Sequence, residues 1–175
     1  MVRKQVLILL LFLLFILEGA LMPWLLPGSW QSTISPNLVF IVLLFVSVYH
    51  HRHTALILGI VFGLIHDVVY YGDMIGPYSF VMGFSAYIMG FIFQTPRAPM
   101  PLMMTVVILG SLLFDSMLFG IYRVFSLTQI SYNWSLLHHI LPDLIVHFVF
   151  GLLIYVPLRK ELEQLSKRVK REKAA

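Results

Sequence analysis

The sequence contains no cysteine and few charged residues. Cysteine is absent from all 175 positions, which excludes disulfides, thiolate metal sites and cysteine nucleophiles. Only 11% of the residues are charged while 59% are hydrophobic, whereas a soluble domain carries about 25% charged residues. The composition therefore indicates an integral membrane protein with little chain left for a separate soluble domain.

Motifs for catalysis and nucleotide binding are also absent. The sequence has no GxSxG, Walker A or GxGxxG motif in a suitable context, and no HExxH zinc motif. A paired intramembrane aspartate catalyst needs flanking glycine motifs that this chain does not contain. We therefore expect no enzymatic activity, no cofactor and no metal.

The net charge of +4 resides entirely in the C-terminal tail. From Leu158 onward there are seven Lys or Arg and three Glu, which leaves five residues of each sign before it. The apolar residues of the tail that repeat at helical spacing are Leu158, Leu162, Leu165 and Val169. This pattern predicts an amphipathic cytoplasmic helix. Attraction to anionic lipid headgroups and docking of a cytoplasmic partner both explain this pattern. Because the composition changes at Leu158, we divide the chain into a membrane domain, 1–157, and a basic tail, 158–175.

Apolar segments separated by proline, glycine and charge clusters predict an all-α, polytopic membrane fold. The six expected spans are 6–26, 38–49, 54–71, 77–94, 102–122 and 141–157. The first apolar run continues past the length of a signal peptide and lacks a small-residue cleavage site, so we interpret it as a span. The second segment is short for a full crossing. A five-span arrangement with a re-entrant second segment is therefore an alternative.

The loop charges favour six spans. Lys and Arg in short loops stay on the cytoplasmic side of a membrane. With six spans and both termini cytoplasmic, eleven of the twelve basic residues lie on that side and only Arg123 lies outside. Removing the second span would place Arg52 with the external loops or require a buried turn there. We therefore expect a multi-pass protein with cytoplasmic N- and C-termini.

The stretch 56–77 holds a carboxylate deep in an apolar segment. Gly59, Gly63 and Asp67 follow one another at four-residue intervals and share one helix face. In the next span, glycines recur every seven residues at Gly76, Gly83 and Gly90. Small residues let helices approach closely in lipid. We predict a close hairpin of these two spans, with Asp67 as a hydrogen-bonded lock, and favour packing within the chain over packing against a partner helix.

Other ionisable residues lie within or at the edges of the predicted spans: Glu18, Asp115, Asp143 and His147. Such groups are functional candidates by default, because a charge in hydrocarbon is costly. No Lys or Arg lies inside a span to pair with them, so we expect protonated or hydrogen-bonded carboxyl groups. A proton or ion pathway would bring discontinuous helices and a repeat between halves, which the sequence does not show. Hydrogen bonds that lock helices are therefore favoured over transport.

A zinc site is an alternative at the start of the last span. His139, Asp143 and His147 recur every four residues and lie on one helical stripe that could ligate zinc. Because no second ligand cluster supports a metal, we favour hydrogen bonds for His139 and Asp143 near the outer headgroups. For His147 we expect a polar contact inside the bundle.

The central motifs resemble those of the rod shape-determining protein MreD family, in the form found in Gram-positive rods. The resemblance rests on Pro36-x-Leu38, on Gly59-x3-Gly63-Leu64-x2-Asp67, and on Gly72 with the Ile75-Gly76 turn. It implies a non-enzymatic protein of the bacterial inner membrane that binds MreC and organises lateral peptidoglycan synthesis. It also implies that MreB, RodA and a class B penicillin-binding protein act with it, and a homodimer is a further option.

The expected fold also resembles the substrate-binding S-components of ECF vitamin transporters, which have six helices of uneven length. A vitamin-binding subunit is therefore the alternative function. Two features disfavour it. The first span reads PheIleLeuGluGlyAlaLeu where those subunits tend to have an AlaxxxAla docking pattern, and the external loops lack a set of residues that could grip a ligand.

Overall fold

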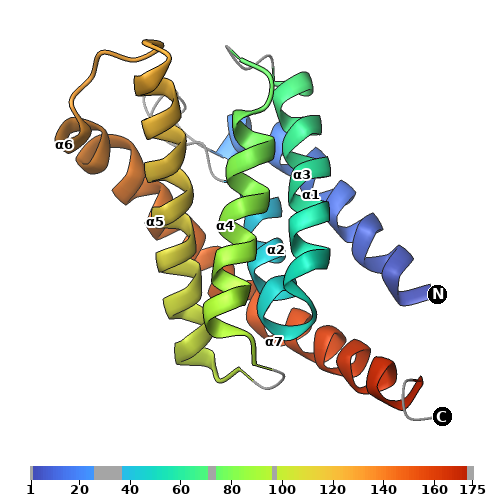
Figure 1. Ribbon diagram of the computed structural model, residues 1–175. Helices are drawn as coiled ribbons and strands as arrows, with labels where there is room; N and C mark the ends of the chain where they lie inside the picture. The colour runs from blue at the N-terminus through green and yellow to red at the C-terminus, as the bar shows by residue number, and fades with distance from the viewer. Residues whose placement is uncertain (1, 26–36, 71–73, 96–97, 173–175) are drawn as a thin grey trace.

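The computed structural model describes residues 2–25, 37–70, 74–95 and 98–172, and it describes side chains within 5–20, 37–70, 74–95 and 98–162. All regular elements in these ranges are helical, which confirms the predicted all-α class. The elements are α1 (Val2–Leu25), α2 (Leu38–Tyr49), α3 (Arg52–Val69), α4 (Pro77–Phe93), α5 (Met100–Val124), α6 (Tyr132–Ser135), the π-helical turn η1 (Leu136–Ile140) and α7 (Leu141–Glu172). They form one bundle, and the start of α1 and the end of α7 both lie at the right of the view in Figure 1.

The short helix α2 lies at the centre of the bundle, behind α3 and α4 in Figure 1. All twelve of its residues are buried, and it contacts α1, α3, α4, α5 and α7. Its sequence is apolar on every side, as expected of a helix enclosed by others. Twelve residues extend about 18 Å, less than the roughly 30 Å of a membrane core. Because both ends of α2 are buried in protein, the backbone N–H and C=O groups at these ends need polar partners within the bundle.

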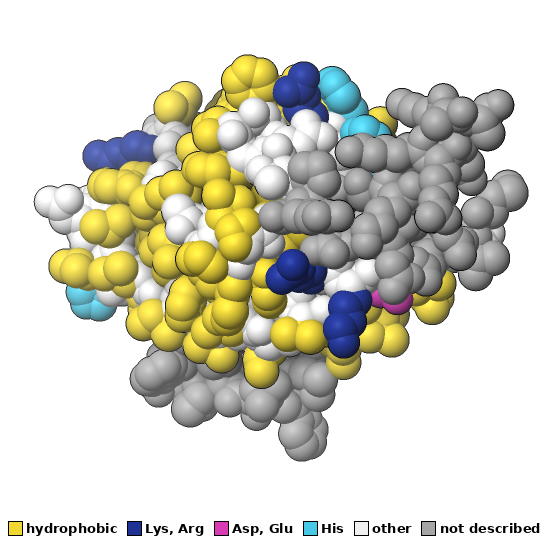
Figure 2. Space-filling model, turned by 90° about the horizontal axis from the view of Figure 1, so that it is seen from below, with side chains coloured by type: hydrophobic (Ala, Val, Ile, Leu, Met, Phe, Trp, Pro, Cys, Tyr) yellow, Lys and Arg dark blue, Asp and Glu magenta, His cyan; other side chains and the backbone are white. Residues whose placement is uncertain are grey.

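Among the residues whose side chains are described, three helices are long and apolar enough to cross a membrane. They comprise Arg52–Val69, Met100–Val124 and Tyr132–Leu162. The other apolar helices of the described residues, Gln5–Ala20, Leu38–Tyr49 and Pro77–Phe93, are shorter. Each of the six predicted segments corresponds to a helix, and five agree with it within a few residues. Six complete crossings remain a prediction. Hydrophobic side chains also cover most of the described surface seen from below, with Lys and Arg side chains isolated among them (Figure 2).

The last helix is longer than predicted at both ends. It begins at Tyr132 and includes η1, in which the Leu141 N–H bonds to the Leu136 carbonyl just before Pro142, a residue without a backbone donor. The helix does not break at Pro157, where the predicted span ends, and the predicted helix of the tail follows directly. Proline removes one backbone donor, but Leu158 and Leu162 beyond it are only 4% and 1% exposed and pack into the core. The backbone continues as a helix to Glu172.

Helices α3 and α4 approach each other through their glycines. A Cβ atom built on Gly59 would lie 2.7 Å from the Cα of Gly83, and one built on Gly63 would lie 2.5 Å from the Cα of Ser79. The Ser79 hydroxyl also donates a hydrogen bond to the Ile60 carbonyl, at 2.9 Å. The two backbones are thus in direct contact, and side chains larger than hydrogen do not fit at these positions.

The same row of small residues on α4 continues toward α2. A Cβ atom on Gly90 would lie 2.9 Å from the Ser47 carbonyl oxygen of α2 and 2.9 Å from the Cβ of Arg52. Gly76 has a different role, because it adopts a left-handed backbone conformation, with φ 118°, at the start of α4. Only glycine reaches that conformation at low cost.

We expect Gly63→Ala to destabilise the protein, because the new methyl group meets the α4 backbone and not a flexible side chain. The expected loss is about 1–3 kcal/mol of unfolding free energy, measured by thermal unfolding in detergent. Gly120→Ala is the matched control, since nothing lies within 4 Å of a Cβ atom there. Equal unfolding temperatures for the two variants would contradict the importance of this close approach.

Candidate functional site

The carboxylate of Asp67 caps the first turn of α4. Its Oδ2 accepts hydrogen bonds from the N–H groups of Gly76 at 2.9 Å and Ser79 at 3.2 Å, and its Oδ1 accepts one from Tyr78 at 3.3 Å. The first backbone donors of a helix have no partner within the helix. Gly76 occupies the N-cap position and has no side chain to satisfy them. Asp67, on the neighbouring helix and only 2% exposed, therefore takes that role.

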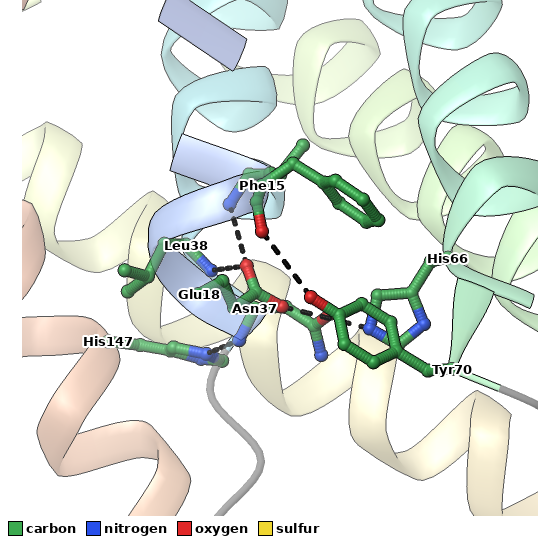
Figure 3. A network of polar contacts seen from close by, with 8 residues as sticks. Phe15, Glu18, Asn37, Leu38, His66, Tyr70 and His147 are labelled. Carbon is green, nitrogen blue, oxygen red and sulfur yellow. Dashed lines mark hydrogen bonds and ion pairs between the residues drawn. The ribbon is translucent and has the colours of Figure 1, made fainter. Parts of the chain in front are cut away.

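Glu18 caps α2 in the same way, from α1. Its Oε2 accepts hydrogen bonds from the N–H groups of Leu38 at 2.9 Å and Val39 at 3.5 Å (Figure 3). Its Oε1 lies 3.7 Å from Nε2 of His66 on α3. One carboxylate thus joins three helices, and a negative charge at the N-terminus of α2 is favourable because of the helix dipole.

His147 on α7 satisfies a third donor at the same end of α2. Its Nε2 accepts a hydrogen bond from the Asn37 N–H at 2.9 Å, as Figure 3 shows. A neutral imidazole that accepts through Nε2 carries its proton on Nδ1, so Nδ1 donates to the Ser111 hydroxyl, 2.9 Å away on α5. Both ring nitrogens are occupied by these bonds. Neither remains for the zinc site considered from the sequence.

Aromatic rings surround Glu18 on the side of α3. The His66 ring stacks on Tyr78, with centroids 4.1 Å apart, and Phe15 packs edge-on against Tyr70 at 5.4 Å. The Tyr70 hydroxyl donates to the Phe15 carbonyl at 3.3 Å.

The opposite end of α2 is held by the connection between α4 and α5. The Thr95 N–H donates to the Val48 carbonyl at 3.1 Å. The hydroxyls of Tyr49 and Tyr155 both donate to the carbonyl of Ala98, at 2.8 and 3.3 Å. The carbonyls at a helix C-terminus need such partners. Both ends of the buried helix are thus hydrogen-bonded to other elements.

Asp115 and Asp143 lie on facing helices, away from these caps. Asp143 on α7 is 5% exposed, and Asp115 lies on α5, one turn beyond Ser111. Oδ2 of Asp115 is buried and accepts no hydrogen bond from the described residues. This carboxyl oxygen has no role in holding a helix end.

The polar residues selected from the sequence thus fall into three groups in space. Glu18 and His147 meet at the start of α2, Asp67 meets the turn at Gly76, and Asp115 and Asp143 lie on the packed helices α5 and α7. The sequence analysis missed other members of these networks, namely Asn37, His66, Tyr70, Tyr78 and Ser111. A useful signal for Ser111 and His66 is that each is a polar residue inside a predicted apolar span.

Removing the Asp67 carboxylate, which caps α4, should lower the free energy of unfolding. Asp67→Ala leaves three backbone donors without an acceptor, so we expect about 2 kcal/mol less unfolding free energy. Asp67→Asn keeps one side-chain oxygen and should lose less. Thermal unfolding of both variants in detergent tests this order, and wild-type stability for Asp67→Ala would exclude the capping role.

Removing the α2 cap should loosen one helix end more than the whole bundle. In Glu18→Ala the amides of Leu38 and Val39 lose their acceptor, and we expect their hydrogen exchange to accelerate about tenfold or more. Hydrogen–deuterium exchange with mass spectrometry of the peptide spanning 37–49 measures this. Gln5→Ala, at an exposed position of α1, is the control. An unchanged exchange rate in Glu18→Ala would contradict the assignment.

Comparisons with known proteins identify the family. The family model for the rod shape-determining protein MreD matches residues 2–165. The chain is also 22% identical to the rod shape-determining protein MreD of Bacillus subtilis (strain 168) over 142 residues, which are 81% of this chain and 82% of that protein. No solved structure matches the chain, so the predicted likeness to ECF S-components finds no support. The chain belongs to the rod shape-determining protein MreD family, and its role is in the determination of rod shape.

Proposed function

We propose that this protein is a non-enzymatic scaffold of the bacterial cell-elongation machinery that binds MreC in the cell membrane. Family membership supports this proposal. MreB, RodA and a class B penicillin-binding protein would act with it indirectly, so that the scaffold helps to organise lateral peptidoglycan synthesis. Its contribution would be helix packing, without a chemical step.

The use of the buried polar groups is the observation that carries the scaffold function. Glu18, Asp67 and His147 each accept hydrogen bonds from the backbone at a helix end. Groups engaged in this way position helices and are not poised as nucleophile and base, which would need a hydrogen bond to each other. Burying these groups costs free energy unless they are hydrogen-bonded. The bonds form only in one arrangement of the helices, and they therefore favour that arrangement.

The proposed topology has six crossings and cytoplasmic termini. With six spans, eleven of the twelve basic residues lie on the side of the two termini. The basic tail would then lie at the inner surface of the membrane, where anionic lipid headgroups attract it.

The glycine face of α3 is not available to MreC, because α4 covers Gly59 and Gly63. Uncovered apolar side chains lie on α1, where Leu9 is 68% exposed. Between α1 and α7 there is an apolar groove of about 250 Å³. Its lining consists of Val6, Leu7, Leu10, Ile154, Pro157, Leu158, Glu161 and Leu162. We propose this groove as the contact for the membrane helix of MreC.

Co-purification tests the proposal. The tagged protein, co-expressed with MreC of the same bacterium and extracted in mild detergent, should retain MreC in near-equal amount, whereas an unrelated multi-pass protein should not. Failure of the wild-type protein to retain MreC would contradict the proposed function.

A matched pair of variants locates the contact. Leu10→Trp obstructs the groove and should reduce MreC recovery about tenfold or more, which corresponds to roughly 1.4 kcal/mol of binding free energy. Leu13→Trp adds the same ring at a position on α1 that is outside the groove and 52% exposed, and should leave recovery unchanged. Equal recovery for both variants would place MreC elsewhere on the scaffold.

A further inference from the structure

Three side chains that can donate hydrogen bonds meet where α3 begins beside α4. The guanidinium carbon of Arg52 lies 5.6 Å from the ring centre of Tyr87, and the ring centre of His53 lies 5.5 Å from that of the same tyrosine. Arg52 also lies 5.1 Å from the ring centre of Phe91. Two successive residues of α3 thus share one aromatic neighbour on α4. We call Arg52, His53 and Tyr87 the Arg52 cluster.

Gly90 explains why the Arg52 side chain lies along α4. A Cβ atom built on Gly90 would lie 2.9 Å from the Cβ of Arg52, so the base of the arginine side chain rests on the α4 backbone. Tyr87 precedes Gly90 by three residues, and Phe91 follows it directly. The faces of aromatic rings attract a guanidinium group. The charge of Arg52 is therefore held at a defined place beside α4.

The donors of the Arg52 cluster have no acceptor within the part of the chain that the structure describes. The side chains of Arg52, His53 and Tyr87 make ring contacts there but no hydrogen bond or ion pair. The first turn of α3 also contains no acidic residue. The guanidinium groups of Arg123 and Arg159, by contrast, donate to carbonyl or hydroxyl oxygens. The Arg52 cluster is therefore open to an acceptor from outside these residues.

The oxygen atoms of a phosphate group suit these donors. Arginine binds phosphate through two parallel hydrogen bonds, and its planar guanidinium can do so while one face lies on an aromatic ring. An imidazole N–H and a phenol O–H can donate to the same oxygens. The chemistry of the Arg52 cluster therefore matches a phosphate anion.

Apolar side chains along α4 favour a lipid as the source of that phosphate. Phe84 and Phe91 are 38% and 65% exposed, and they lie two turns apart on one face of the helix. Within a membrane, exposed apolar side chains contact acyl chains. A phospholipid carries its phosphate at the end of such chains, whereas free phosphate has no part that matches the apolar surface.

We propose that the Arg52 cluster binds the headgroup phosphate of an anionic phospholipid, whose acyl chains lie against the exposed face of α4. In the proposed topology the cluster lies at the inner membrane surface, where anionic lipids attract basic residues. A lipid bound there joins α3 and α4 at the end of the hairpin opposite to the Asp67 cap. The site is separate from the basic tail and from the groove between α1 and α7.

Thermal unfolding of the purified protein in a neutral detergent tests this site. The probes are phosphatidylglycerol, phosphatidylcholine and inorganic phosphate, each titrated at constant ionic strength. Phosphatidylglycerol should raise the unfolding temperature in a saturable manner, by about 5 °C at a hundredfold excess over its Kd. Phosphatidylcholine, which has no net charge, should give a smaller rise, and inorganic phosphate should give none. An equal rise with either of these two probes would overturn the proposal.

Variants separate the Arg52 cluster from general attraction to the basic tail. In Arg52→Gln, the phosphatidylglycerol concentration that gives half of the rise should increase about tenfold, because the charge and the paired donors are lost. Lys160→Gln removes an exposed positive charge outside the cluster and should change that concentration less than about twofold.

Tyr87→Phe provides a second variant if Arg52→Gln does not fold. It keeps the aromatic ring and removes only the hydroxyl group, and it should increase the half-rise concentration about threefold. The proposal fails if Arg52→Gln folds and has the half-rise concentration of the wild-type protein. It also fails if Arg52→Gln does not fold and Tyr87→Phe has the wild-type value.

Discussion

The structure depends on satisfying the backbone donors at the start of α2. This helix is enclosed by five others, and its first turn lies where no bulk water can reach the N–H groups. An unsatisfied amide in apolar surroundings costs several kcal/mol. Glu18 of α1 and His147 of α7 avoid that cost by accepting hydrogen bonds from these N–H groups. The positions of α1 and α7 relative to α2 are thereby defined by directional bonds, which apolar packing alone would not provide.

The hairpin of α3 and α4 follows the same principle with a different chemistry. Backbone contact at Gly59 and Gly63 brings the helices close, but small residues alone permit sliding along the shared face. The three bonds of Asp67 to the first turn of α4 fix the register at one end. Packing supplies proximity and the carboxylate supplies the register, which explains why an acid is retained in an apolar segment.

Local features of the sequence predict the helices, while contacts between distant residues escape prediction. The range 38–49 agrees with α2 because Pro36 and Asn37 precede it and a His-rich turn follows it. The spacing of Gly59, Gly63 and Asp67 is enough to define one helix face. The donors that Asp67 meets cannot be foreseen, because they depend on the left-handed turn at Gly76. The helical tail beyond Pro157 is predicted from its spacing, whereas the burial of Leu158 and Leu162 against the bundle depends on tertiary packing that the sequence does not show.

The bond between Asn37 and His147 spans 110 positions of the chain. Ribosomes deliver α2 to the membrane long before α7 exists, so a growing chain holds this amide without its imidazole partner. Glu18 of α1 is made earlier and can already accept from Leu38 and Val39, but the Asn37 amide needs water or a lipid headgroup as its acceptor until α7 inserts. The full set of bonds at the start of α2 therefore forms only after the last helix has been made.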